Sequence, residues 1–86
     1  MSENKKQIAI LGSTGSIGKQ ALEVIADNNE LFEVYALTAN NQVDLLIEQA
    51  LRFRPEMVVI ANEQHYLKLK EALTGLPIKV FAGNES

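Results

Sequence analysis

Residues 10–18 read ILGSTGSIG, and they place glycine at positions 12, 15 and 18 directly after a short apolar run. A loop of this composition between a strand and a helix favours an anion, because free main-chain N–H groups and the helix N-terminus carry partial positive charge. We expect Gly12 to permit a sharp turn, Gly15 to let a phosphate approach the main chain, and Gly18 to let the helix pack closely on the sheet. The sequence therefore predicts a phosphate-binding loop.

The rest of the chain alternates between short apolar runs and stretches with helical spacing. Strands are expected at residues 7–11, 32–38, 57–60 and 78–81. Helices are expected from Ser16 to about residue 27, across residues 46–51 with an end near Arg54 before a proline, and from an N-cap at Asn62 to a stop at Gly75. This order predicts an α/β fold, namely a truncated βαβαβαβ part of a Rossmann-like, doubly wound parallel sheet. In such a sheet we expect the fourth strand beside the first, on its other side, which creates a crevice at the glycine loop.

Composition excludes several classes of function. The chain has 86 residues, so it holds at most one small domain, and any larger fold is incomplete within it. A net charge of −3 without a basic cluster argues against nucleic-acid and membrane partners. With no cysteine and a single histidine, His65, no nucleophile–base pair can be assembled. The polar start MSENKK is neither a signal peptide nor a membrane span, so a cytoplasmic location is expected.

The spacing of the loop and the residues after the second strand indicate the class of nucleotide. Two departures argue against a nucleoside-triphosphate P-loop, because residue 13 is serine where that motif has glycine and Gln20 stands where it has a hydroxyl. The pattern GxxGxxG is instead used by several NADP-dependent reductases and epimerases. NAD sites commonly carry an acid at the end of the second strand, whereas residues 37–42 contain none. The sequence therefore favours NADP, with the hydroxyls of Ser13, Thr14 and Ser16 as additional donors.

Two longer stretches carry a resemblance to a known family. ILGSTGSIG followed by KQALEVI, and ALTANNQVDLLIEQALRFRPEMVVI, are similar to the N-terminal segment of the 1-deoxy-D-xylulose 5-phosphate reductoisomerases. The resemblance implies an enzyme that uses NADPH and a divalent metal, Mg or Mn. It implies rearrangement and reduction of a sugar phosphate, 1-deoxy-D-xylulose 5-phosphate, to 2-C-methyl-D-erythritol 4-phosphate in non-mevalonate isoprenoid biosynthesis. It also implies a homodimer and inhibition by fosmidomycin.

The resemblance further implies which residues contact the coenzyme. Together with Gly12 of the loop, the predicted cofactor-binding residues are Thr14, Gly15, Ser16, Ile17, Asn40, Asn41 and Gln42. Many members have Gly, then Lys or Arg, then Asn at the last three positions, where this chain has Asn, Asn and Gln. Amide donors would thus partly replace a cation at the 2′-phosphate. Gln49 and its neighbour Glu48, in the second helix, are expected to be surface or packing residues rather than ligands.

The resemblance also implies where this segment belongs. The family's metal-binding carboxylates, substrate-phosphate site and flap lie beyond residue 86, so residues 1–86 are expected to be the N-terminal part of an NADPH-binding domain without catalytic residues or metal ligands. Such a segment alone should be poorly stable, because a sheet edge and helix faces stay uncovered. Two alternatives remain: a stand-alone nucleotide-binding regulatory module, or a segment of an NADP-dependent semialdehyde dehydrogenase.

Overall fold

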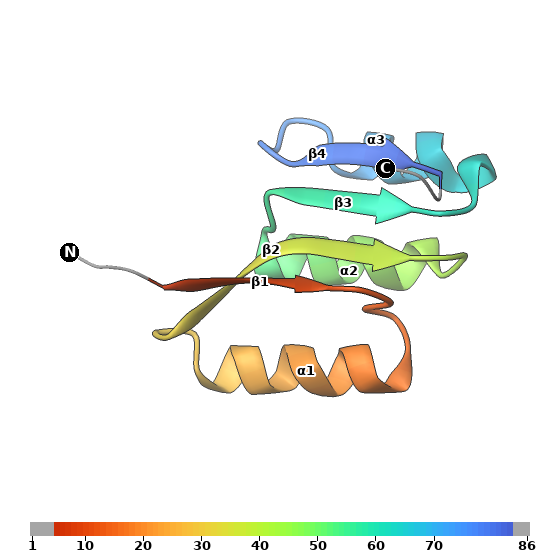
Figure 1. Ribbon diagram of the computed structural model, residues 1–86. Helices are drawn as coiled ribbons and strands as arrows, with labels where there is room; N and C mark the ends of the chain where they lie inside the picture. The colour runs from red at the N-terminus through yellow and green to blue at the C-terminus, as the bar shows by residue number, and fades with distance from the viewer. Residues whose placement is uncertain (1–4, 84–86) are drawn as a thin grey trace.

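The computed structural model describes residues 5–83, which alternate strands and helices along the chain (Figure 1). The strands are β1 (Lys6–Ile10), β2 (Phe32–Ala39), β3 (Met57–Ile60) and β4 (Lys79–Ala82). The helices are α1 (Ser16–Asp27), α2 (Val43–Phe53) and α3 (Tyr66–Ala72), with a 3₁₀ turn, η1 (Glu63–His65), before α3. All four predicted strands and all three predicted helices are confirmed. Only the third helix differs in form, since it begins as a 3₁₀ turn.

The helix ends have local causes. Arg54 adopts a left-handed conformation (φ 51°) and closes α2 through a hydrogen bond from its N–H to the carbonyl of Ala50, one residue before Pro55. Asn62 caps η1, because its side-chain oxygen accepts from the backbone N–H of Gln64 at 2.9 Å. Gly75 has a φ of 90° and follows α3, as a terminating glycine does. Each helix end is determined by residues adjacent to it in the sequence, which explains why the helices could be predicted from the sequence.

The strands form one parallel sheet in the order β1-β2-β3-β4, so the predicted position of the fourth strand is wrong. Val80 pairs with Val58 of β3, and among the described residues β1 pairs only with β2. The physical reason is that right-handed crossovers through helices on one face carry each new strand in the same direction. Because α3 packs against both α2 and β4, the third crossover continues that direction instead of reversing it.

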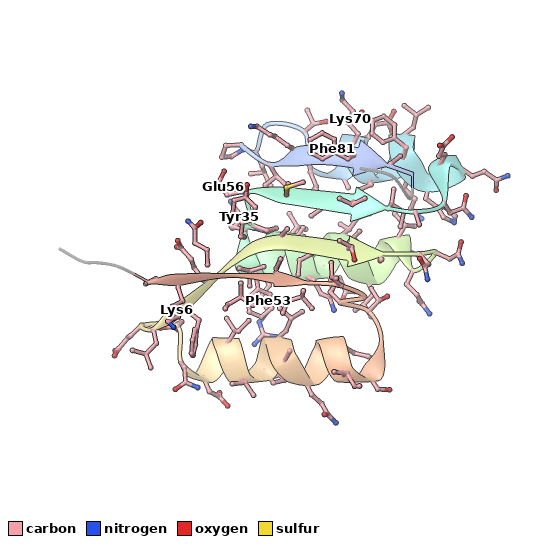
Figure 2. The ribbon with its side chains drawn as sticks, in the orientation of Figure 1. Lys6, Tyr35, Phe53, Glu56, Lys70 and Phe81 are labelled. Carbon is pink, nitrogen blue, oxygen red and sulfur yellow. The ribbon has the colours of Figure 1, made fainter. Side chains whose placement is uncertain are left out.

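One core joins the three helices to a single face of the sheet. Leu37, Val58 and Ile60 from the strands pack in the same cluster as Leu46 of α2 and Leu69 of α3, and all five are fully buried. In Figure 1, α2 and α3 lie behind the strands and α1 runs beneath β1. Figure 2 shows Phe53 in the space between α1 and the sheet, where it packs against this core. The Rossmann-like α/β class is therefore confirmed.

The other face of the sheet has no helix over it in the part of the chain that the structure describes. Tyr35 is 41 % exposed and Phe81 is 40 % exposed; both are marked in Figure 2. Tyr35 is also the extra residue at an irregularity in the pairing, since Ile8 pairs with Val34 and Ala9 with Ala36. Parallel sheets are ordinarily covered on both faces, so this surface is unusual for the fold.

None of the helices within residues 5–83 has the length and apolar character that crossing a membrane requires.

Candidate functional site

Two of the three loop glycines are required by the fold. Gly12 has a φ of 70°, the left-handed conformation that side chains disfavour, and its carbonyl accepts from the N–H of Gly15 at 3.0 Å to close the turn. A Cβ at Gly18 would lie 2.3 Å from the carbonyl oxygen of Gly12 and 2.6 Å from the Cα of Ser13. The predictions for Gly12 and Gly18 are confirmed, with one refinement. The close contact of Gly18 is with the backbone of the loop rather than with a strand.

The third glycine, Gly15, is not required by the fold. Its backbone is extended (φ −83°, ψ 175°), which any residue can adopt. A Cβ there would lie 3.5 Å from the Gly12 carbonyl oxygen, an ordinary contact, and the residue is exposed. The structure thus has room for a side chain at Gly15. The absence of a side chain there would matter only to a molecule that binds against the outside of the loop.

The exposed side of the loop is a set of hydrogen-bond donors. Helix α1 begins at Ser16, and the N–H groups of its first turn have no partner within the helix. Gly15 stands at the N-cap position and has no side chain to accept from them, and the first turn contains no acid. Ser16 and Ile17 are exposed, while Thr14 is half-buried. The amides and the helix dipole together suit an anion.

Ser13 faces the opposite way, so its predicted role as a donor to a ligand is wrong. Its side chain is fully buried, and its hydroxyl donates to Oε1 of Gln49 at 2.7 Å. Gln49 returns the contact by donating from Nε2 to the Ser13 carbonyl oxygen at 2.9 Å. Gln49 is 7 % exposed, which agrees with the packing role expected of it. The sequence could have indicated that Gln49 is buried and hydrogen-bonded. It lies on the same helical face as Leu46 and Ala50, and a buried side-chain amide needs hydrogen-bonding partners.

The loop is also attached to β2. The N–H of Gly12 donates to the Thr38 hydroxyl at 2.9 Å, and the N–H of Ser13 donates to the Thr38 carbonyl at 2.8 Å. These bonds, with those to Gln49, hold the backbone of the loop from two elements that are distant in sequence. The protein's own hydrogen bonds therefore hold the loop in this conformation.

The second predicted segment, residues 40–42, lies beside the glycine loop, because the carboxyl ends of parallel strands share one edge of the sheet (Figure 1). Asn40, Asn41 and Gln42 are all exposed. Asn62, which follows β3, makes two hydrogen bonds to this segment. Its Nδ2 donates to Oδ1 of Asn41 at 2.7 Å, and its backbone N–H donates to the Asn40 carbonyl at 3.0 Å. Sequence reasoning identified Asn62 only as a helix cap and missed this contact, which pairs residues 21 positions apart.

The charged groups near the second segment are already paired. Asp44, in the first turn of α2, is the acid nearest in sequence to residues 40–42. Nζ of Lys68 in α3 lies 2.7 Å from Oδ1 of Asp44, and the side chain of Lys68 is 59 % exposed and that of Asp44 is 78 % exposed. Tertiary structure thus brings a cation to a region whose own sequence has none. Among residues 5–83, no group of three or more His, Asp or Glu side chains is arranged to hold a metal ion.

A hollow of about 340 Å³ between α1 and α2 is not part of this site. Glu23, Arg52 and Phe53 line it, and it includes none of the eight predicted cofactor-binding residues. The ion pair across it, from Arg52 to Glu23 at 3.4 Å, joins two side chains that are each more than half exposed. Such a pair contributes little to stability. The candidate site is therefore the edge of the sheet, not this groove.

Comparison with known proteins agrees with the sequence resemblance. Residues 8–86 match the family model described as 1-deoxy-D-xylulose 5-phosphate reductoisomerase. The protein of that name from Phocaeicola vulgatus is 71 % identical over 82 residues, which cover 95 % of this chain and 22 % of the relative. The one from Saccharophagus degradans is 48 % identical over 83 residues, covering 94 % and 21 %. This chain thus spans about a fifth of the length of the curated relatives it matches.

Solved structures give the same result. The enzyme from Zymomonas mobilis in complex with NADPH superimposes with a TM-score of 0.88 at 40 % identity, covering 93 % of this chain and 21 % of that one. A structure of DOX-P reductoisomerase in complex with NADPH, fosmidomycin and magnesium has a TM-score of 0.86 at 33 % identity, covering 93 % and 20 %.

Proposed function

The chain belongs to the 1-deoxy-D-xylulose 5-phosphate reductoisomerase family, and we propose from this that it is the N-terminal part of the NADPH-binding domain of such an enzyme. The whole protein would rearrange and reduce 1-deoxy-D-xylulose 5-phosphate to 2-C-methyl-D-erythritol 4-phosphate in isoprenoid biosynthesis. Within residues 1–86 the role is to hold the coenzyme. Catalytic residues and the ligands of a divalent metal would lie in the remainder of the enzyme.

The observation that carries the proposal is Gly15. The fold tolerates a side chain there, whereas a side chain at this position would obstruct a pyrophosphate that lies against the exposed N–H groups of Ser16 and Ile17. Two apolar side chains of the same region are exposed, since Leu11 is 79 % exposed and Ile17 is 82 % exposed. A dinucleotide has a charged centre between flat rings, so this combination of donors and apolar side chains suits it. The coenzyme in the Zymomonas mobilis complex supports the same role for this chain.

Selectivity for NADPH is supported by the second segment. A carboxylate at the end of β2 would bind the ribose hydroxyl of NADH and repel a 2′-phosphate. Residues 38–42 contain no acid, and the nearest one in sequence, Asp44, is paired with Lys68. Asn40, Asn41 and Gln42 provide neutral donors instead. We therefore expect a preference for NADPH over NADH.

The open face of the sheet supports the proposal that this segment is part of a larger domain. Tyr35 and Phe81 remain exposed on a parallel sheet that is normally covered on both sides. The rest of the enzyme would cover this face and supply the metal site.

A homodimer in the cytoplasm is proposed for the whole protein, as the resemblance implies. Family membership argues against the semialdehyde dehydrogenase alternative. A reading frame that stops at residue 86 would favour the regulatory-module alternative.

The proposal is tested by coenzyme titration of the full-length gene product that contains residues 1–86. Nicotinamide fluorescence would give dissociation constants for NADPH and NADH with the wild type and with Gly15→Val. We expect the variant to bind NADPH at least about a hundredfold more weakly, which corresponds to losing one or two charge-assisted hydrogen bonds. Its unfolding temperature should be nearly unchanged, because the nearest contact of a new Cβ is 3.5 Å away.

A matched control is Ala72→Val, at the exposed end of α3, which adds apolar bulk far from the loop. This variant should keep the wild-type affinity. Equal NADPH affinity of Gly15→Val and wild type would refute the placement of a phosphate at the loop.

A further inference from the structure

A chain of three hydrogen-bonding groups determines how the side-chain amide of Asn41 is oriented. The backbone N–H of Gln64 can only donate, and it donates to Oδ1 of Asn62 at 2.9 Å. The amino group of Asn62 must then point the other way, and it donates to Oδ1 of Asn41 at 2.7 Å. The oxygen of Asn41 is occupied by this contact, so its amino group faces outward.

The backbone around this contact is held as firmly as the side chains. The N–H of Asn62 donates to the carbonyl of Asn40 at 3.0 Å, and the N–H of Ala61 donates to the carbonyl of Ala39 at 2.8 Å. The carbonyl of Asn41 accepts from the N–H of Val43 at 2.8 Å. These bonds join the chain after β3 to the chain after β2, and they place Asn62 beside residues 40–42.

From this geometry we infer that Asn62 is a positioning residue for coenzyme selectivity: it turns the donor group of Asn41 toward the 2′-phosphate. The inference rests on the proposed function and deepens it. A phosphate accepts hydrogen bonds but cannot supply one to a carbonyl oxygen when it is fully ionised. Residues 38–42 contain no cation, and the Lys68 ammonium that lies near them is paired with Asp44 at 2.7 Å. An amide turned the wrong way would therefore present an oxygen to the phosphate without a cation of the segment to compensate. The orientation of this amide thus decides whether Asn41 attracts or repels the group that distinguishes NADPH from NADH.

The variant Asn62→Asp separates this role from a structural one. An aspartate still accepts from the Gln64 N–H, so the cap of η1 is retained. Its second oxygen is an acceptor as well, and Asn41 must turn its amino group inward and its oxygen outward to meet it. We expect NADPH to bind about tenfold more weakly or worse while NADH affinity changes little, so the selectivity ratio falls.

Two controls account for the added charge. Gln64→Glu introduces the same charge two residues away and leaves the backbone N–H in place, so the ratio should stay near the wild-type value. In an Asn41→Ala background there is no amide to turn, and Asn62→Asp should then leave the ratio unchanged. A purely electrostatic effect would lower the ratio equally with Gln64→Glu, or equally with and without Asn41, and either result would overturn the inference.

The titrations use the full-length gene product with NADPH and NADH as probes. Selective NADPH binding by the wild type together with an unchanged ratio in Asn62→Asp would overturn the inference about Asn62 and leave the proposed function standing. A wild type that binds neither coenzyme would refute the proposed function and the inference with it.

Discussion

Replacing Gln49 by leucine would remove the side chain that holds the inner side of the glycine loop. The variant leaves two groups of Ser13 without partners, the hydroxyl and the carbonyl, in a residue that is fully buried. Each unpaired buried group costs about 1–3 kcal/mol, and the added apolar burial of leucine returns about 1–2 kcal/mol. At the midpoints of these ranges we expect the loop to lose about 2.5 kcal/mol of stability. The amides of Ser13 and Gly15, which donate at 2.8 and 3.0 Å, should then exchange about 60-fold faster.

Combining Gln49→Leu with Ser13→Ala tests the interaction between the two side chains. Ser13→Ala by itself leaves only the oxygen of Gln49 without a donor and should cost about 1–2 kcal/mol. In the double variant a single buried group, the carbonyl of residue 13, stays unpaired. The combined loss should therefore fall below the sum of the two single losses by about 2–5 kcal/mol, the cost of the hydroxyl and of the Gln49 oxygen that the double variant no longer leaves unpaired. Hydrogen–deuterium exchange of the peptide that covers β1 and the loop in the full-length gene product would measure all three variants. Losses that add to within about 0.5 kcal/mol would refute a direct Ser13–Gln49 interaction.

Two further predictions concern the backbone of the same loop. Gly18→Ala should destabilise the protein by about 3 kcal/mol or more, because its Cβ would lie 2.3 Å from a carbonyl oxygen, whereas Gly15→Ala should change the unfolding temperature little. Similar unfolding temperatures for the two variants would contradict the different roles of these glycines. Thr38→Val removes the acceptor of the Gly12 N–H and should lower the free energy of unfolding by about 0.5–1.5 kcal/mol, as measured by thermal unfolding. Thr38→Ser keeps the hydroxyl, so its stability should lie closer to that of the wild type.

Most of the secondary structure could be predicted because its signals are local. The strand at residues 57–60 and the start of α1 at Ser16 agree with the structure residue for residue, and the other strand ends differ by at most one residue. Apolar periodicity, a capping asparagine and a proline act over a few neighbouring residues, so they can be read without knowing the fold. Gly12 and Gly18 were assigned correctly for the same reason, since a strand that meets a helix through a tight turn needs glycine in particular places.

The position of β4 and the direction of Ser13 could not be predicted in the same way. Which edge of the sheet receives a strand depends on the face against which the preceding helix packs, and α3 packs beside α2. The sequence predicts Ser13 as a donor to a ligand because its hydroxyl lies in the glycine loop and can donate a hydrogen bond. It turns inward because α2 places Gln49 beneath the loop, 36 residues away in sequence.

The amino-acid sequence alone determined the alternation of strands and helices, the glycine loop at the end of β1 and the family to which the chain is similar, because each depends on residue types at short spacing. Only the tertiary structure decided which groups of the site face outward. Asn41 and Asn62 are separated by 21 positions, and Ser13 and Gln49 by 36, yet each pair is within hydrogen-bonding distance. A hydrogen bond has a direction, and that direction is set only when strands from different parts of the chain lie side by side.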